Sequence, residues 1–200
     1  MAWGNGGCSD DGASSRFHLL EIASHGYLVI ASGRILSGPG APPRERRPDA
    51  QPGQIPPPRT QLSDLSEAVD WALAENQRTG SPYFGRIDPA LVAYSGWSCG
   101  GLQALQVAKD PRVKTLVLHN TGVLNDGPGA IPGMDVRKDV LQSLHTPAIT
   151  FWAVPRTSRI PTAWMISNGS RTCRLRSPIS RWVTAAPSTN RTVALLRRLP

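Results

Sequence analysis

The sequence predicts an α/β protein with a mostly parallel sheet and helices on both of its faces. Short, continuously apolar runs alternate with segments of helical periodicity, a pattern typical of parallel strands joined by crossover helices. The runs at residues 27–31 and 113–119 hold few polar residues, which indicates strands buried on both faces. With 40% hydrophobic and 18% charged residues, 200 residues fit one domain with a sizeable core.

The expected elements follow in order along the first 150 residues. Residues 17–24 and 65–77 have apolar side chains at helical spacing, and Ser63 or Asp64 is suited to cap the second helix. Between these helices, residues 33–59 contain eight prolines and are expected to form a long irregular loop. Further along, the pattern predicts strands at 91–94 and 113–119, a short helix at 139–144, and a strand at 146–150.

The last quarter of the chain differs in composition from the rest. Residues 151–200 hold nine arginines, no lysine and no acidic residue, whereas residues 1–150 carry 13 basic and 14 acidic side chains. The net charge of +8 therefore belongs to the tail. We expect residues 1–150 to form the core, and 151–200 to be a disordered or irregular basic tail foreign to that fold. Nucleic-acid-binding arms usually mix lysine with arginine, so we expect no nucleic-acid partner.

Composition also bears on the compartment and the cofactors. Residues 1–12 lack the basic and hydrophobic regions of a signal peptide, so the chain as written is expected to be cytoplasmic. No apolar run has the length of a membrane span, and no membrane partner is expected. Cys8, Cys99 and Cys173 are odd in number and lack metal-ligand spacing, which predicts neither a disulfide framework nor a zinc site. We expect no metal and no other cofactor.

One segment carries the functional prediction. An apolar run leads into GWSCG at 96–100, and a helical pattern follows, which is the context that G-x-S-x-G requires when its serine, Ser98, is a nucleophile. The turn is so tight that the residues two before and two after the serine need almost no side chain, and Gly96 and Gly100 meet this requirement. Gly101 adds room for close packing of helix on sheet. An ordinary glycine-rich turn is the alternative interpretation.

A serine nucleophile also needs backbone N–H donors for the oxyanion that forms during the reaction. The N–H of Cys99, next to Ser98 at a helix start, is the first candidate. The second is Gly7, with Gly6 close behind, in a glycine-rich segment for which a simple flexible start is the alternative. Cys99 is expected to pack as a small apolar side chain and not to act as a thiol nucleophile. Trp97 is interpreted either as core or as the wall of an acyl pocket.

The sequence does not supply a base and an acid for Ser98 in the expected order. In hydrolases with this motif, the acid follows the nucleophile along the chain and the histidine follows the acid. His119 and His145 come too early after Ser98, and His18 and His25 precede it, with His25 expected to start a buried strand. None of the four is therefore predicted to be the base. Three aspartates also precede the expected position of the acid, namely Asp126, Asp135 and Asp139.

Five segments are specific in combination: WGNGGC, EIASHGYLVIA, AVDWALAEN, FGRIDP and VAYSGWSCGGLQAL. Together they resemble the α/β-hydrolase superfamily, and within it esterases similar to dienelactone hydrolases, chlorophyllases and polyester hydrolases. The resemblance covers residues 1 to about 149. It implies a serine hydrolase that forms an acyl-enzyme at Ser98 on a small carboxylic ester, with Gly7 and Cys99 as oxyanion donors. A non-catalytic binding protein with a basic tail is the alternative.

The chain departs from this family at both ends. The family has at least two strands before the oxyanion loop, and its acid and histidine lie in later segments resembling GGPTD and VGHGG, neither of which occurs here. When the tail is reverse-translated and read from the third base of each codon, both strings are permitted. The acid then falls between Arg156 and Thr157, and the histidine between Val183 and Thr184. We hypothesise a frameshift near Ile149, and we expect a weak or inactive esterase.

Overall fold

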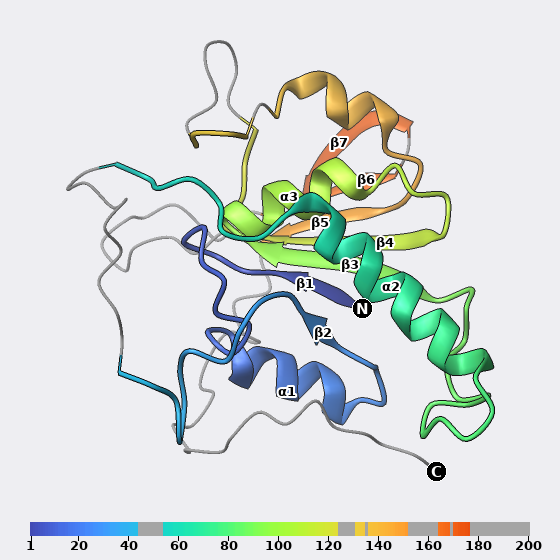
Figure 1. Cartoon of the computed structure of the whole chain (residues 1–200). Helices are drawn as coiled ribbons and strands as arrows, with labels where there is room; N and C mark the ends of the chain where they lie inside the picture. The colour runs from blue at the N-terminus through green and yellow to red at the C-terminus, as the bar shows by residue number, and fades with distance from the viewer. Residues whose placement is uncertain (44–53, 124–130, 135, 152–163, 169, 177–200) are drawn as a thin grey trace.

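The computed structural model describes residues 1–43, 54–123, 131–134, 136–151, 164–168 and 170–176. Strands and helices alternate along the core (Figure 1). The strands are β1 (Ala2–Gly4), β2 (Ile30–Ala31), β3 (Val92–Trp97), β4 (Val113–His119), β5 (Ala148–Phe151), β6 (Trp164–Asn168) and β7 (Ser170–Arg176). The helices are α1 (Arg16–Ser24), α2 (Leu62–Gln77), α3 (Cys99–Val107) and the 3-10 helix η1 (Lys138–Ser143).

The strands form one sheet in the order β2-β1-β3-β4-β5-β6-β7. The first five are mutually parallel, and β6 and β7 continue the sheet with antiparallel pairing. The prediction of a mostly parallel α/β sheet is therefore confirmed. The strand at 113–119 matches β4 in full, whereas the run at 27–31 contributes only two residues to β2, an edge strand of the sheet. Tyr27 is 56% exposed and lies outside that strand.

Helices cover both faces of the sheet, as Figure 1 shows with α1 on one side and α2 and α3 on the other. Consecutive residues of β1 divide between the two faces because side chains alternate along a strand. Ala2 belongs to the cluster that holds Leu65 of α2 and Leu105 of α3, whereas Trp3 belongs to the cluster that holds Leu19 of α1. Truncating one of these buried leucines to alanine costs about 2–5 kcal/mol, so both layers stabilise β1 from above and below.

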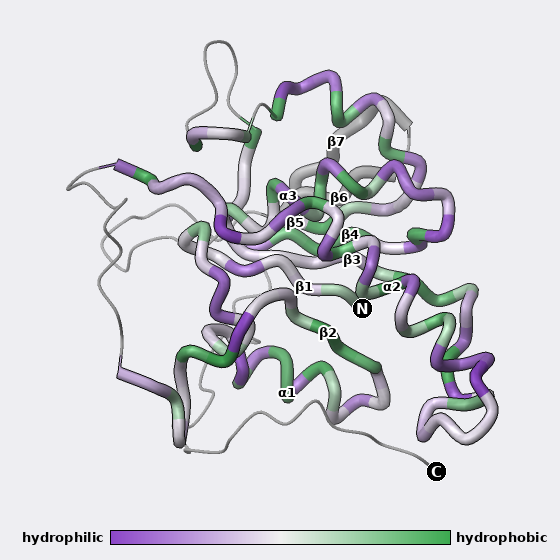
Figure 2. Tube along the Cα trace, viewed as in Figure 1, coloured by the Kyte–Doolittle hydropathy of each residue, from purple (hydrophilic) through white to green (hydrophobic). Residues whose placement is uncertain are grey.

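Helix α2 begins earlier than the sequence suggested. Its N-cap is Gln61, and neither Ser63 nor Asp64 has that role. Asp64 instead occupies the third helical position, where its carboxylate accepts the Gln61 backbone N–H at 3.0 Å. Hydropathy alternates along the helix in Figure 2, and the hydrophobic side buries Leu65 and Val69 against the sheet. The predicted amphipathic helix is therefore confirmed, whereas the predicted cap at Ser63 or Asp64 is wrong.

Part of the expected irregular tail is strand. Residues 164–168 and 170–176 form β6 and β7, and β6 pairs with β5 in the register Ala148 to Ser167. This pairing satisfies backbone groups that would otherwise form an open sheet edge at β5. The other residues of the 151–200 tail, apart from Phe151 at the end of β5, lie outside the described residues.

Candidate active site

The order of the strands reverses between β1 and β3. From β1 the chain passes through α1 to β2, which pairs with one edge of β1. Helix α2 then leads to β3, which pairs with the other edge of β1. The carboxyl ends of the two strands are in register, because Gly4 pairs with Gly96. Open α/β sheets usually bind ligands outside such a reversal, at the carboxyl ends of the strands. The loop after β1 and the segment 96–100 both lie at this position.

Ser98 connects β3 to α3 and has a backbone conformation that serine rarely adopts. Its φ is 52° and its ψ is −115°, and a conformation of this kind costs a non-glycine residue about 1–3 kcal/mol. The Ser98 N–H donates to the His119 carbonyl at 2.9 Å, and the Thr121 hydroxyl lies 3.0 Å from the Ser98 carbonyl. These contacts with the end of β4 hold the strained turn. A strained turn between strand and helix is the geometry that a nucleophile elbow requires.

Ser98→Gly is expected to raise the free energy of unfolding by about 1 kcal/mol, because glycine adopts this φ without the penalty of a Cβ. The gain is partly offset by the greater freedom of glycine in the unfolded chain. Urea denaturation followed by circular dichroism measures the change. Ser98→Ala is the matched control, since it removes the hydroxyl and keeps the Cβ. Equal stability of the glycine and alanine variants would contradict backbone strain at this position.

Glycines allow the backbones around the elbow to approach closely. A Cβ on Gly100 would overlap the backbone of Gly4, and a Cβ on Gly96 would overlap the backbone of Gly100. The requirement for minimal side chains at 96 and 100 is therefore confirmed, with the added reason that α3 starts directly against β1. A Cβ on Gly101 would overlap the Thr121 side chain and would lie 3.1 Å from the Gly96 carbonyl oxygen of β3, so Gly101 also allows the close packing of α3 on the sheet that was expected.

The loop after β1 runs beside the elbow. A Cβ on Gly6 would meet the ring of Trp97, so this ring lies against the loop. Trp97 is 43% exposed, which excludes it from the core and leaves the interpretation as a wall of the site. Gly7 and Cys8 both have positive φ, 65° and 50°, within a turn that the Ser9 N–H closes on the Gly6 carbonyl at 3.3 Å. The segment is a defined turn and not a flexible start.

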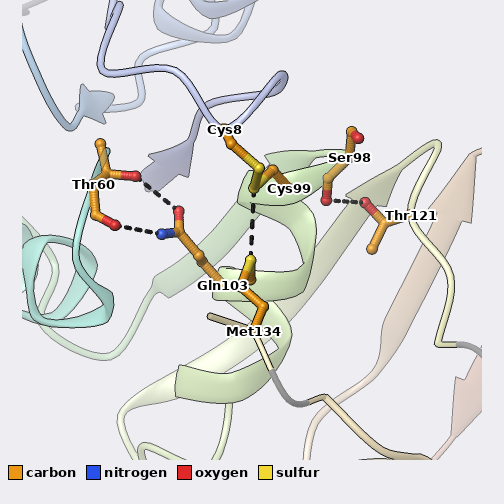
Figure 3. The surroundings of a disulfide bond; sticks show 7 residues. All are labelled: Cys8, Thr60, Ser98, Cys99, Gln103, Thr121 and Met134. Atoms are coloured by element: carbon orange, nitrogen blue, oxygen red, sulfur yellow. Dashed lines mark hydrogen bonds between the residues drawn. A yellow bond between two sulfur atoms is a disulfide. The ribbon is translucent and has the colours of Figure 1, made fainter. Parts of the chain in front are cut away.

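A disulfide joins this loop to the elbow, which contradicts the prediction that the cysteines form no disulfide framework. The Cα atoms of Cys8 and Cys99 are 5.2 Å apart, and Figure 3 shows the bond between the loop after β1 and the first residue of α3. An odd number of cysteines and a separation of 91 residues concealed the pair. Cys99 therefore does not pack as a free thiol, although its surroundings are apolar and include Ile131 and Met134.

A second tie reaches α3 from the end of the proline-rich segment. The Thr60 hydroxyl donates to the Gln103 side-chain oxygen at 3.0 Å, and the Gln103 amide donates back to the Thr60 carbonyl at 2.8 Å (Figure 3). Both residues are buried, so each polar group needs this partner. Next to Thr60, the Arg59 N–H donates to the Cys8 carbonyl at 3.2 Å. The one feature of the sequence that indicates this contact is Gln103, a glutamine on the otherwise apolar side of α3.

Two of the four histidines lie at the opposite edge of the sheet from Ser98. The Nε2 of His145 is 3.2 Å from the carbonyl of Val113, the first residue of β4. His25 ends α1 ahead of β2, and its Nε2 is 3.1 Å from the carboxylate of Glu21. His25 therefore does not start a buried strand as expected, and both positions exclude a role as the base.

The other two histidines lie in an aromatic cluster on the α1 side of the sheet. The ring centroid of His119 is 4.8 Å from that of His18, 5.5 Å from that of Trp3 and 5.3 Å from that of Phe151, on which it stacks. Burial lowers the pKa of His119 to about 4, and the charge of His18 contributes. Burial also lowers the pKa of His18. Within the described residues, no hydrogen bond joins either ring to the Ser98 hydroxyl.

This cluster predicts a loss of stability in acid. Because the pKa of His119 falls from 6.5 to about 4 on folding, the unfolded state takes up the proton more readily, and stability present above pH 6.5 is lost toward pH 4. The ring is partly exposed, so screening limits the loss to about 1–2 kcal/mol. Urea denaturation at neutral pH and near pH 4.5 should reveal a smaller loss for His119→Phe, which keeps an aromatic ring without titration. Equal losses would exclude this cause.

The described residues provide no acid for the site in the expected arrangement. Asp139 is exposed in η1, whereas Asp126 and Asp135 lie outside the described residues, as do the positions at 156–157 and 183–184 where the shifted frame would supply an acid and a histidine. Where the chain is described, no three histidine, cysteine or acidic side chains are grouped so as to hold a metal ion. The described part of the site therefore consists of the strained Ser98, the start of α3 and the loop after β1.

Comparison with the models of known protein families finds no match, and comparison with curated proteins finds none either. Across the described parts of the chain, no helix combines the length and apolar character needed to cross a membrane. The α/β class of the fold follows from the sheet itself.

Proposed function

We propose that this chain is a serine hydrolase of the α/β-hydrolase type that acts on small carboxylic esters through an acyl-enzyme at Ser98. The strained backbone of Ser98, between a parallel strand and a helix, is the observation that carries the proposal. Non-glycine residues keep such conformations only where their surroundings enforce them, and these positions are concentrated at active sites. The reversal of strand order beside Ser98 supports the same conclusion.

In the proposed reaction, the Ser98 hydroxyl attacks the ester carbonyl, and the N–H groups of Cys99 and Gly7 donate to the resulting oxyanion. Cys99 is the first residue of α3, so its N–H has no acceptor within the helix and points with the positive end of the helix dipole. Gly7 precedes Cys8, which is bonded to Cys99, so the two donors belong to segments that are tied together. The Trp97 ring forms a wall beside Ser98 against which an acyl group packs.

The activity of this chain is expected to be weak. Without an imidazole hydrogen-bonded to Ser98 among the described residues, the attacking hydroxyl has to lose its proton to water, and an unassisted serine hydroxyl is a poor nucleophile. Enzymes stripped of their triad residues keep an acceleration of about 10³–10⁴ over water from oxyanion stabilisation and binding alone. Residual hydrolysis on this scale is what the site supports.

The disulfide favours an oxidising compartment over the cytoplasmic one expected from the sequence. Disulfides persist in secreted and other oxidised proteins and are rare where thiol reductants are abundant. Alkylation of free thiols before digestion, followed by mass spectrometry of unreduced peptides, should detect the Cys8–Cys99 pair in protein purified without reductant. Recovery of both cysteines as alkylated thiols would remove this argument.

Hydrolysis of p-nitrophenyl acetate tests the proposed function. The chain should release p-nitrophenolate faster than its Ser98→Ala variant, and mass spectrometry should find an acetyl group on Ser98 when the reaction is quenched early. Ser63→Ala, an exposed serine on α2, is the matched control and should leave the rate unchanged. Equal rates for the chain and for Ser98→Ala, with no acetylated peptide, would eliminate catalysis by Ser98.

A non-catalytic binding protein is the second candidate. The lack of any imidazole on the Ser98 hydroxyl within the described residues favours it, because a site of this shape retains ligand binding when its base is lost. In this case the chain would bind short esters without Ser98-dependent turnover. The basic tail would then act as a contact surface, and salt-dependent binding to nucleic acid would support that role.

A further inference from the structure

We infer that the Cys8–Cys99 disulfide positions the two oxyanion donors, so that breaking it lowers turnover while the α/β fold persists. This inference rests on the proposed function. Each cysteine is next to a residue with a proposed role, since Cys8 follows Gly7 and Cys99 follows Ser98 and is itself a donor. With their Cα atoms held 5.2 Å apart, the bond sets the separation of the two donor segments.

The disulfide holds Cys8, at the tip of the loop after β1, against α3, whereas the sheet holds the base of this loop at Gly4. At the base, Gly4 pairs with Gly96, and the neighbouring Asn5 side chain donates to the Ser32 carbonyl at 2.7 Å. At the tip, Cys8 keeps a φ of 50°, a strained conformation for an L-residue, and its carbonyl also accepts the Arg59 N–H at 3.2 Å. Breaking the disulfide removes the covalent tie between the tip and α3, so the strained tip can shift relative to α3 while the base stays in register.

The hydrophobic cores do not depend on this bond. Neither cysteine belongs to the clusters that pack α1, α2 and α3 on the sheet. Cys8 and Cys99 lie in a smaller cluster with Met134, whose sulfur is 3.6 Å from the Cys99 sulfur (Figure 3). That approach is a van der Waals contact, because a disulfide sulfur carries no hydrogen to donate. Two thiols can occupy the same apolar surroundings, so the cores are expected to survive reduction.

A dithiol such as dithiothreitol accomplishes the reduction. Its thiolate attacks one sulfur, the Cys8–Cys99 bond breaks, and a second exchange closes the reductant into a cyclic disulfide. Two electrons and two protons pass to the protein, which then carries two thiols. Cys8 and Cys99 are 1% and 2% exposed, so the exchange is expected to be slow and to require local opening of the loop.

The expected consequence is a loss of kcat without a comparable change in KM. Removing one donor from an oxyanion hole costs about 10²–10³ in kcat. Partial displacement of the Gly7 segment should therefore lower kcat for p-nitrophenyl acetate by about 10–100-fold. KM should change by less than about twofold, because Trp97 belongs to β3 and stays paired with His119 of β4 when the disulfide is broken.

The decisive measurement compares p-nitrophenyl acetate with its thionoacetate analogue, in which sulfur replaces the carbonyl oxygen. Sulfur is larger and accepts hydrogen bonds weakly, so the ratio of oxygen to sulfur rates reports the geometry of the donors. The oxidised chain, the dithiothreitol-reduced chain, a Cys8→Ala/Cys99→Ala double variant and a Cys173→Ala control are assayed with both esters. Circular dichroism is recorded for each sample, and the reduced chain is also assayed after reoxidation.

The inference predicts that reduction and the double variant lower kcat and the oxygen-to-sulfur ratio together, with an unchanged far-UV spectrum. Reoxidation should restore both quantities, and Cys173→Ala should match the oxidised chain. If kcat and the oxygen-to-sulfur rate ratio stay unchanged after reduction, the inference is overturned and the proposed function stands. Loss of the far-UV signal after reduction would also overturn the inference alone, because the bond would then be purely structural. Absence of Ser98-dependent hydrolysis in the oxidised chain would overturn both.

Discussion

Gly100→Ala is expected to lower the free energy of unfolding by about 3 kcal/mol or more. The added methyl group would overlap the backbone of Gly4, and neither partner is the flexible end of a side chain. Overpacking of a rigid site usually costs about 1–3 kcal/mol, and here two main chains have to separate. The higher helix propensity of alanine than of glycine offsets only about 1 kcal/mol of this destabilisation. A native domain is stable by about 5–15 kcal/mol, so this loss is a large fraction of the total.

Urea denaturation gives the stability of Gly100→Ala, and hydrolysis of p-nitrophenyl acetate by the folded fraction reports the donor geometry. Separating α3 from β1 should also remove residual activity, because the proposed donors lie on either side of this contact. Gln106→Ala, a half-buried position of the same helix, is the control and should change stability by less than about 0.5 kcal/mol. A stability for Gly100→Ala equal to that of the control would contradict the close approach.

The fold was predictable where the signal is local. The predicted strand at 113–119 matches β4 to the residue, because Val113, Leu116 and Leu118 are apolar and buried and Lys114 is the one exposed residue of the run. Errors occurred where tertiary position decides the outcome. The run at 27–31 resembles a buried strand, yet it lies at the edge of the sheet and pairs through only two residues. The predicted start of α2 is wrong because Gln61 is a less common cap than serine or aspartate.

The same distinction holds at the site. Gly96, Ser98 and Gly100 could be predicted because all the residues that form this tight turn are close together in the sequence. The partners that stabilise the turn were not, since the fold brings them from distant segments: Thr121 lies 23 residues after Ser98, and Cys8 lies 91 residues before Cys99. The spacing of residues in a single sequence does not indicate which distant residues are in contact in the fold. The disulfide and the contact at Thr121 could only be found in three dimensions.

Restoring the shifted reading frame is expected to raise kcat/KM for p-nitrophenyl acetate by about 10³-fold or more. The hypothesis assigns an acid to the junction of Arg156 and Thr157 and a histidine to the junction of Val183 and Thr184. Triad residues act as a unit, and removing them from a serine hydrolase costs about 10⁴–10⁶ in kcat, so their return should recover much of that factor. The elbow and the proposed donors lie before the hypothesised frameshift and need no change.

The experiment replaces residues 151–200 by the polypeptide encoded in the third-base frame of the natural gene. Ser98→Ala in the restored chain should abolish the gain, and alanine at the restored histidine should do the same, because the nucleophile is inert without its base. The pH dependence should also change, since a working imidazole base adds a rate increase near its own pKa. A third-base frame that lacks the acid and histidine codons would end the hypothesis before any assay. A restored chain no faster than the original would show that Ser98 does not act with a restored acid and histidine. This result would favour the non-catalytic binding protein.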